Sequence, residues 1–254
     1  MKLMAILNVT PDSFSDGGKY FSPEAAIARA FELERDGADI LDIGAQSTRP
    51  GCGAVPPAEE LRRLRPVLEG LRGRLGIPLS VDTFYPEVAE EALGLGAVIV
   101  NDVSGSVTEE MAGVVRARGA CWALTHNRGG ADARPHYGDV VGEVRAALEE
   151  LAARAMALGV PKERLWLDPG IGFGKSGEDN LRLLANLARV KVPGFALLAG
   201  VSRKRVTGGS EAGTAAAQAV AQMGGADALR THDVVAARQA ANFMRNILRF
   251  RIDK

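Results

Sequence analysis

The sequence has no excess of charge of either sign, since its 254 residues include 31 Lys and Arg against 31 Asp and Glu. Proteins that bind nucleic acid or an anionic membrane through their overall electrostatic field usually carry a basic excess. The sequence therefore predicts no nucleic-acid partner and no membrane partner. Hydrophobic residues make up 46% of the chain, which together with the balanced charge excludes disorder as the main state.

Cysteine is scarce, and long hydrophobic runs are missing. The two cysteines, Cys52 and Cys121, cannot make a disulfide framework, and neither belongs to a CxxC motif. This usage is typical of a reducing compartment. No apolar run approaches the length of about 18 residues that spans a membrane, and the apolar segment 1–7 is too short for a signal peptide. We therefore expect a cytoplasmic protein.

Apolar runs alternate regularly with amphipathic segments along the whole chain. Because the runs are almost continuously hydrophobic, they are typical of parallel strands buried on both faces. Strand alternating with helix eight times in this length predicts a (β/α)8 TIM barrel, an α/β fold, as a single domain over residues 1–254. A doubly wound open sheet is the competing fold. The predicted strands are residues 3–9, 40–44, 79–82, 98–102, 121–125, 165–168, 196–201 and 228–231, and examples of predicted helices are 23–35, 58–72, 87–93, 140–158 and 234–248.

Polar side chains stand where the predicted strands end. In a barrel these ends share one face, and active sites are built there. The alternative is that each residue caps the next helix, because Asp, Asn and Ser are common at that position. Capping is a poor explanation for all eight ends together. The residues are Asn8, Asp42, Asp82, Asn101, His126, Asp168, Ser202 and His232.

Three loops carry features of a binding site. The loops at residues 10–18 and 46–53 are long and suit a lid that closes over a substrate. The glycine-rich segment 168–176 resembles a phosphate-binding loop, but its glycine spacing does not fit that motif. We interpret these glycines as allowing a tight backbone turn beneath a flat ligand.

The remaining polar residues favour an anion site rather than hydrolysis or zinc. Arg230 and His232 lie two residues apart and so share one face of an extended strand, which makes them a plausible anion clamp. The chain has three histidines with no zinc spacing and no GxSxG motif. With Asp82 and Asp168 below, the pattern predicts a polar heterocycle that carries a phosphate-type leaving group.

Seven segments, in order along nearly the whole chain, resemble those of the dihydropteroate synthase family. They are LNVTPDSFSD (7–16), STRPG (47–51), SVDT (80–83), NDVSG (101–105), DPGIGFGK (168–175), SRK (202–204) and RTHD (230–233). The resemblance implies a TIM barrel that joins p-aminobenzoate to 6-hydroxymethyl-7,8-dihydropterin diphosphate, releases pyrophosphate and serves folate biosynthesis. It also implies inhibition by sulfonamides and a homodimer.

The resemblance also implies a role for each matching residue. Asp82, Asn101, Asp168 and Lys204 would hold the pterin, and Thr48, Pro50, Phe14 and Ser202 would frame p-aminobenzoate. Asn8, Arg49, Arg230 and His232 would hold the diphosphate with Mg2+. Asp16 would help to organise the metal or the closed first loop. The groups expected to act in catalysis are Asp82, Asp168, Lys204 and Arg49.

The sequence departs from the family in places. The family commonly has Met on both sides of the His after the fifth strand, where this chain has Thr125 and Asn127. The departure leaves a pterin-binding paralogue without synthase activity as an alternative. A folate-dependent methyltransferase module is a second alternative, against which the segments 47–51 and 202–204 argue. Apolar residues of the last helix, including Val234 and Met244, could pack on the barrel or on a second subunit.

Overall fold

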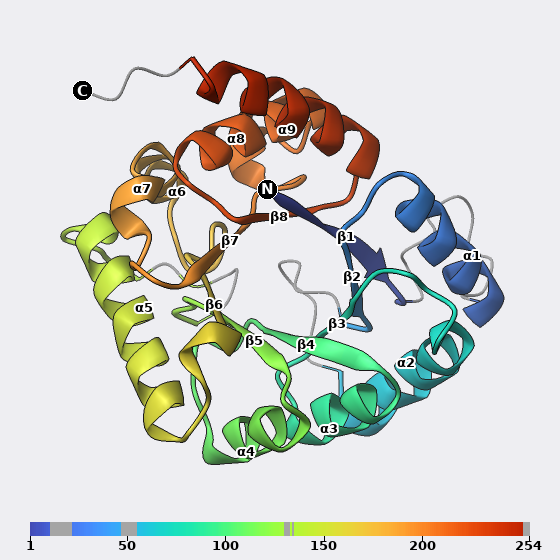
Figure 1. Cartoon of the computed structure of the whole chain (residues 1–254). Helices are drawn as coiled ribbons and strands as arrows, with labels where there is room; N and C mark the ends of the chain where they lie inside the picture. The colour runs from blue at the N-terminus through green and yellow to red at the C-terminus, as the bar shows by residue number, and fades with distance from the viewer. Residues whose placement is uncertain (11–21, 47–54, 130–132, 134, 251–254) are drawn as a thin grey trace.

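Eight parallel strands form a closed barrel in which each strand pairs with its neighbours in the chain and β1 closes on β8 (Figure 1). The computed structural model describes residues 1–10, 22–46, 55–129, 133 and 135–250. The barrel confirms the predicted (β/α)8 fold, while a single domain over residues 1–254 stays a prediction. The strands are β1 (Lys2–Asn8), β2 (Ile40–Gly44), β3 (Leu79–Asp82), β4 (Ala97–Asp102), β5 (Cys121–Thr125), β6 (Leu165–Asp168), β7 (Ala196–Gly200) and β8 (Ala228–Thr231).

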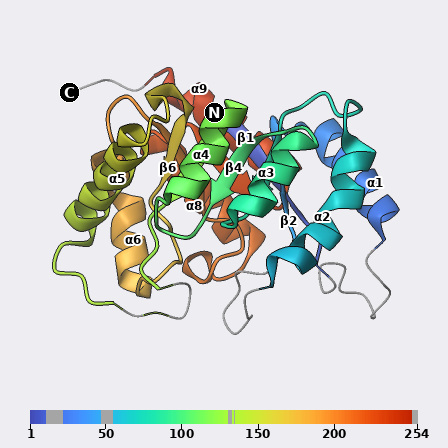
Figure 2. The ribbon, with the colours of Figure 1, turned by 90° about the horizontal axis from the view of Figure 1, so that it is seen from below.

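Helices form a layer outside the strands, as the side view shows (Figure 2). Most of them begin at a Ser, Thr or Asp whose side chain accepts a hydrogen bond from the first turn, as Ser22, Thr108 and Asp233 do. The helices are α1 (Pro23–Arg35), α2 (Pro57–Leu71), α3 (Pro86–Gly94), α4 (Glu109–Arg118), α5 (Val140–Ala157), α6 (Gly177–Ala185), α7 (Leu187–Val190), α8 (Glu211–Met223) and α9 (Val234–Leu248). Within the part of the chain that is described, no helix is long and apolar enough to cross a membrane.

The barrel interior is divided into an apolar layer and a polar layer. Side chains alternate across a strand, and residues paired between neighbouring strands share a face. The apolar layer lies toward the start of the strands and contains Met4, Ile40, Ile99, Ala123, Leu198 and Ala228. Two residues further along β2, β4 and β8 come Asp42, Asn101 and Arg230. The ligand site therefore has an apolar floor and polar walls.

Helix α9 settles a question that the sequence left open. Its apolar stripe, which includes Val234, Ala237 and Ala241, is buried, so these residues pack within the chain rather than on a second subunit. A different set of apolar side chains remains exposed on α9, among them Phe243 and Ile247. Strand β4 begins at Ala97, one residue before the predicted start. It pairs with β3 through an irregular register, and Val98 at this irregularity is exposed.

Candidate active site

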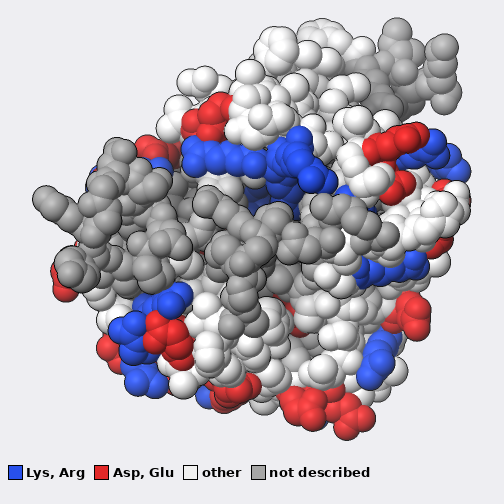
Figure 3. Space-filling model, turned by 180° about the vertical axis from the view of Figure 1, so that it is seen from behind, with Lys and Arg blue, Asp and Glu red and all other residues white. Residues whose placement is uncertain are grey.

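The polar residues at the strand ends are not helix caps. The N-terminal caps of the helices between the strands are other residues, such as Ser22, Thr108 and Asp139. At the eighth strand the cap of α9 is Asp233, the residue after His232. The capping alternative is therefore wrong for these positions, and several of these polar groups bond to one another inside the barrel instead. Figure 3, which looks at the face opposite to that of Figure 1, shows Lys and Arg side chains gathered near its centre.

Arg230 lies at the centre of a buried ionic network. Its Nε donates to Asp42 Oδ2 at 2.6 Å, and its Nη2 donates to Asp82 Oδ2 at 2.5 Å. Asn101 Nδ2 donates to the same Asp42 oxygen at 3.1 Å. The three predicted residues Asp82, Asn101 and Arg230 are thus brought together, and Asp42 connects them from β2. Two of the guanidinium nitrogens of Arg230 therefore donate to carboxylates inside the barrel. The sequence analysis expected Arg230 only as a contact to the diphosphate.

The ionic network shifts the pKa values of its members. Burial raises the pKa of Asp82 to about 7, with the positive Arg230 opposing the rise and Asp42 adding to it. Burial alone would lower the pKa of the Arg230 guanidinium, but Asp42 and Asp82 outweigh burial and raise it above its ordinary value. Arg230 therefore stays charged, whereas burial shifts Asp82 toward its protonated form, in which the carboxyl can donate as well as accept a hydrogen bond.

Asp168 and Lys204 face each other on the opposite wall. Asp168 Oδ1 accepts a hydrogen bond from Gly170 N at 2.7 Å, and Lys204 Nζ donates to the carbonyl of Ile171. The same ammonium lies 4.7 Å from the centre of the Phe173 ring. Burial lowers the pKa of Lys204 to about 8, although the nearby Asp168 carboxylate favours its charge. An aromatic ring, a cation and a carboxylate are thus arranged as a flat, polar heterocycle requires.

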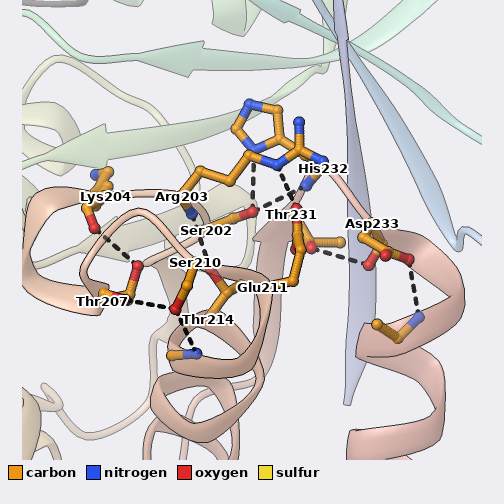
Figure 4. A network of polar contacts seen from close by, with 12 residues as sticks. Ser202, Arg203, Lys204, Thr207, Ser210, Glu211, Thr214, Thr231, His232 and Asp233 are labelled. Carbon is orange, nitrogen blue, oxygen red and sulfur yellow. Dashed lines mark hydrogen bonds and ion pairs between the residues drawn. The ribbon is translucent and has the colours of Figure 1, made fainter.

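Ser202 and His232 form a pair at the rim, as Figure 4 shows. Ser202 Oγ lies 3.0 Å from His232 Nδ1 and accepts a hydrogen bond from His232 N at 3.2 Å. Arg203, which follows Ser202, has a φ of 55° and is the one non-glycine residue with positive φ in the described part of the chain. This left-handed turn lets Ser202 face His232 while Lys204 faces Phe173.

The two departures from the family fall at different places. The Thr125 side chain is 2% exposed, and Thr125 pairs with Asp168 across β5 and β6, so its hydroxyl lies in the polar layer. Asn127 Nδ2 instead donates to Val103 O at 2.7 Å and joins two loops. Only Thr125 therefore changes the wall of the pocket.

Sequence reasoning missed Lys175 and the role of Asp42. Lys175 belongs to the glycine-rich segment and is buried, with its Nζ 2.9 Å from His126 Nδ1. A lysine inside an otherwise apolar and glycine-rich segment was the available signal, but the segment was interpreted for its glycines alone. Asp42 was recognised as a strand-end residue, and its bond to Arg230 depends on a strand that follows much later in the chain.

Several predicted residues lie outside the described residues, so their roles stay predictions. Asn8, at the end of β1, is described and is partly buried. It follows Met4 and Ile6 on the strand face that points into the barrel. The residues outside the described part are Phe14, Asp16, Thr48, Arg49 and Pro50.

Comparisons with known proteins identify the family of the chain. Residues 4–232 match the family model described as pterin binding enzyme. The chain therefore belongs to the pterin-binding enzymes, a class of barrel proteins. It is 44% identical over 250 residues, 93% of this chain and 86% of the relative, to a dihydropteroate synthase of Synechocystis. Its place within the class is thus among the dihydropteroate synthases.

Solved structures support the same family. The dihydropteroate synthase of Xanthomonas albilineans with 4-aminobenzoic acid has 46% sequence identity and a TM-score of 0.92, and the match covers 98% of this chain and 94% of that one. The same enzyme in complex with 7,8-dihydropteroate has 43% identity and a TM-score of 0.88 over the same shares. The barrel fold is therefore that of this family.

Proposed function

We propose that the described site binds 6-hydroxymethyl-7,8-dihydropterin diphosphate and p-aminobenzoate and joins them to 7,8-dihydropteroate, releasing pyrophosphate in folate biosynthesis. The observation that carries the proposal is the polar layer inside the barrel. There Asp42, Asp82, Asn101 and Arg230 form one bonded network opposite Asp168 and Lys204. The apolar floor beneath this layer limits the depth to which a flat ring can enter.

The pterin is held by acceptors and donors at opposite walls. Asp168 and Asn101 offer acceptor oxygens to the ring N–H groups, and Lys204 offers a donor to a ring carbonyl. Phe173 supplies an aromatic surface beside Lys204. Asp82 can serve in either sense, because burial raises its pKa to about 7.

The reaction breaks the C–O bond between the exocyclic carbon of the pterin and the diphosphate, and it forms a C–N bond to the neutral arylamine. Negative charge then grows on the leaving oxygens, and Arg230 with His232 would stabilise it from the rim. Positive charge grows on the pterin, where the carboxylates of Asp168 and Asp82 favour it. The amine loses a proton after the attack, and this proton passes to water or to the released pyrophosphate. Arg49, which lies outside the described residues, is the further predicted contact to the diphosphate.

Magnesium is the cofactor that the proposal includes. The partly buried amide of Asn8 at the barrel mouth is a hard oxygen ligand and would hold the ion. Mg2+ in enzymes commonly takes one or two side chains together with substrate phosphates. The described residues contain no group of three or more His, Cys, Asp or Glu that could hold a metal, so the diphosphate would supply most ligands. Bound there, the ion would neutralise leaving-group charge; Asp16, outside the described residues, is the second predicted ligand.

Pyrophosphate release tests the proposal. Purified protein is incubated with the dihydropterin diphosphate, p-aminobenzoate and Mg2+, and dihydropteroate is followed by chromatography. We expect product that requires both the amine and the metal. Binding of the pterin without any product would refute the synthase reaction and support the paralogue that only binds pterins.

We further propose a homodimer in the cytoplasm. Support for the dimer comes from apolar side chains that remain exposed on α8 and α9, among them Met223, Phe243 and Ile247. These two helices lie side by side on one flank of the barrel (Figure 1). Exposed apolar clusters of this kind are typical of protein interfaces. The proposed localisation rests on the cysteine usage and on the lack of a membrane-length apolar run or a signal-peptide pattern in the sequence.

A further inference from the structure

Lys175 is a buried lysine that the reaction described above does not use. Lys175 is 2% exposed and has one of the largest fully buried side chains of the protein. Within the described residues, no carboxylate forms an ion pair with it. Lysines are almost never fully buried without a charged partner, so the position calls for a specific reason.

The amino group of Lys175 joins two segments of the barrel mouth. Its Nζ lies 2.9 Å from His126 Nδ1 and 3.3 Å from His126 O, at the end of β5. It also donates to Gly170 O and Phe173 O, each at 2.9 Å, in the loop that follows β6. Three carbonyl oxygens and one imidazole nitrogen thus converge on a single amine. Without it their lone pairs would face each other with no donor between them.

The loop fixed by Lys175 is the one that carries the pterin contacts. Phe173 lies against the Lys204 ammonium, and the Ile171 carbonyl accepts from it. Gly170 N donates to Asp168. A shift of the carbonyls of Gly170 and Phe173 would therefore move the aromatic surface and the cation relative to the carboxylate.

The loop is also pressed against β5 too closely to find another position easily. Gly170 has a φ of +66°, and a Cβ at this residue would lie 1.9 Å from His126 O. From the other side, Asn180 Oδ1 of α6 accepts from Gly172 N at 2.7 Å. Lys175 and Asn180 therefore hold the same loop from two directions, one through its carbonyls and the other through an N–H group.

We propose that Lys175 is a positioning residue for the pterin: its amino group holds residues 170–173 so that Phe173 and Lys204 stand opposite Asp168, which sets the affinity for the pterin substrate. The inference rests on the function proposed above and adds to it a residue that touches neither substrate. Burial lowers the pKa of Lys175 to about 7, with Asp168 opposing. A neutral amine keeps two N–H donors, enough for the carbonyls of Gly170 and Phe173, and so can still perform this role.

Substitution of Lys175 by Met tests the inference, because Met has a side chain of similar length but no hydrogen-bond donor. Calorimetry measures the Kd of 6-hydroxymethyl-7,8-dihydropterin diphosphate, and turnover gives kcat and the KM of each substrate. We expect Lys175→Met to raise the Kd and KM of the pterin about tenfold or more. The kcat and the KM of p-aminobenzoate should change by less than about threefold. Lys175→Arg, which restores donors, should recover part of the affinity.

Tyr137→Phe is the matched control, because Tyr137 OH donates to Gly174 O at 3.2 Å in the same loop but does not touch the carbonyls of residues 170–173. We expect less than about a twofold change in the Kd of the pterin. If Lys175→Met does not fold, as circular dichroism would reveal, Asn180→Ala releases the same loop and should weaken pterin binding in the same direction.

Two results would overturn the inference. One is a folded Lys175→Met that binds the pterin like the wild type, and the other is a loss of kcat with unchanged pterin affinity. The proposed function fails differently, since the wild type would then bind the pterin without forming dihydropteroate. The effect of Lys175 on binding would remain measurable in that case.

Discussion

The hydroxyl of Thr125 is a buried polar group in the pocket wall. Thr125 is 2% exposed, and its Oγ1 has no hydrogen-bond partner among the described residues. A buried hydroxyl of this kind costs about 1–3 kcal/mol unless a ligand satisfies it. It pairs in register with Asp168, which Lys204 faces, so the pterin is the ligand within reach.

Thr125→Val removes this hydroxyl and keeps the shape of the side chain. We expect the KM of the pterin to rise about tenfold, the equivalent of one lost hydrogen bond. The free energy of unfolding should stay equal or increase, because an unpaired polar group is removed. Steady-state kinetics and urea denaturation measure the two quantities. A loss of stability with unchanged KM would show that the hydroxyl serves the fold and not the ligand.

Lys175 gives the stability of the protein a defined pH dependence. Burial lowers its pKa from 10.5 to about 7 in the folded chain. Between these values the unfolded chain binds the proton and the folded chain does not, so this group makes stability rise with pH. The charged groups that act on it are Asp168, Lys204, Arg128 and Asp179.

We expect the wild type to gain stability relative to Lys175→Met as the pH rises from 7 to 10, by at most about 1.4 kcal/mol per pH unit. Urea denaturation of both proteins at several pH values in this range provides the difference. A difference that stays flat would mean that Lys175 remains charged throughout, and a difference that falls would reverse the sign argued here.

The loop between β7 and α8 depends on one strained residue. Arg203 adopts a left-handed conformation, and its backbone N donates to Thr214 Oγ1 of α8 at 3.0 Å. Its ion pair with Glu211 is solvent-exposed and so contributes little. The backbone conformation is therefore the feature of Arg203 on which Ser202 and Lys204 depend.

Two substitutions separate the backbone of Arg203 from its charge. Arg203→Gly tolerates the left-handed turn, and we expect the KM of p-aminobenzoate to stay within about threefold. Arg203→Val disfavours that turn strongly and should lower the free energy of unfolding by about 1–3 kcal/mol. Thermal unfolding and kinetics of both variants provide the comparison. Similar losses in the two variants would assign the effect to the guanidinium instead.

The strands, and the helices given as examples in the sequence analysis, were predictable because the hydrophobic patterns that specify them are local in the sequence. Residues 40–44, 79–82, 121–125 and 165–168 were predicted with the bounds that the structure has. The bonds of Arg230 were not predictable in this way. They link β8 to β2 and β3 across the barrel interior, and no pattern within a segment specifies which carboxylate a buried guanidinium meets. The polar residues at the strand ends indicated where the candidate site lies. Which of them bond to one another, as Arg230 does to Asp42 and Asp82, became clear only from the closed barrel.

The exposed apolar side chains on the flank formed by α8 and α9 are the basis of the proposed dimer. Phe243 is 66% exposed, whereas the neighbouring stripe of α9 is buried within the chain. Phe243→Glu should convert a dimer to a monomer, because a charge in an apolar interface must be desolvated. Light scattering after size-exclusion chromatography measures the mass.

Leu181→Glu is the control for this test, since Leu181 is an exposed apolar residue of α6. It should leave the dimer intact. A wild type that is monomeric at micromolar concentration, or a dimer that Leu181→Glu disrupts equally, would contradict the assignment of the interface to α8 and α9.

The bond between Arg230 and Asp42 spans 188 residues of sequence. During synthesis β2 leaves the ribosome long before β8. Arg230, the cation that pairs with the Asp42 carboxylate, is therefore missing until the last strand is made. Closing so long a loop costs entropy that is recovered only when the final contacts form. The nascent chain therefore cannot complete its barrel and its pterin pocket separately. A truncated or stalled chain that lacks β8 would be both open and inactive.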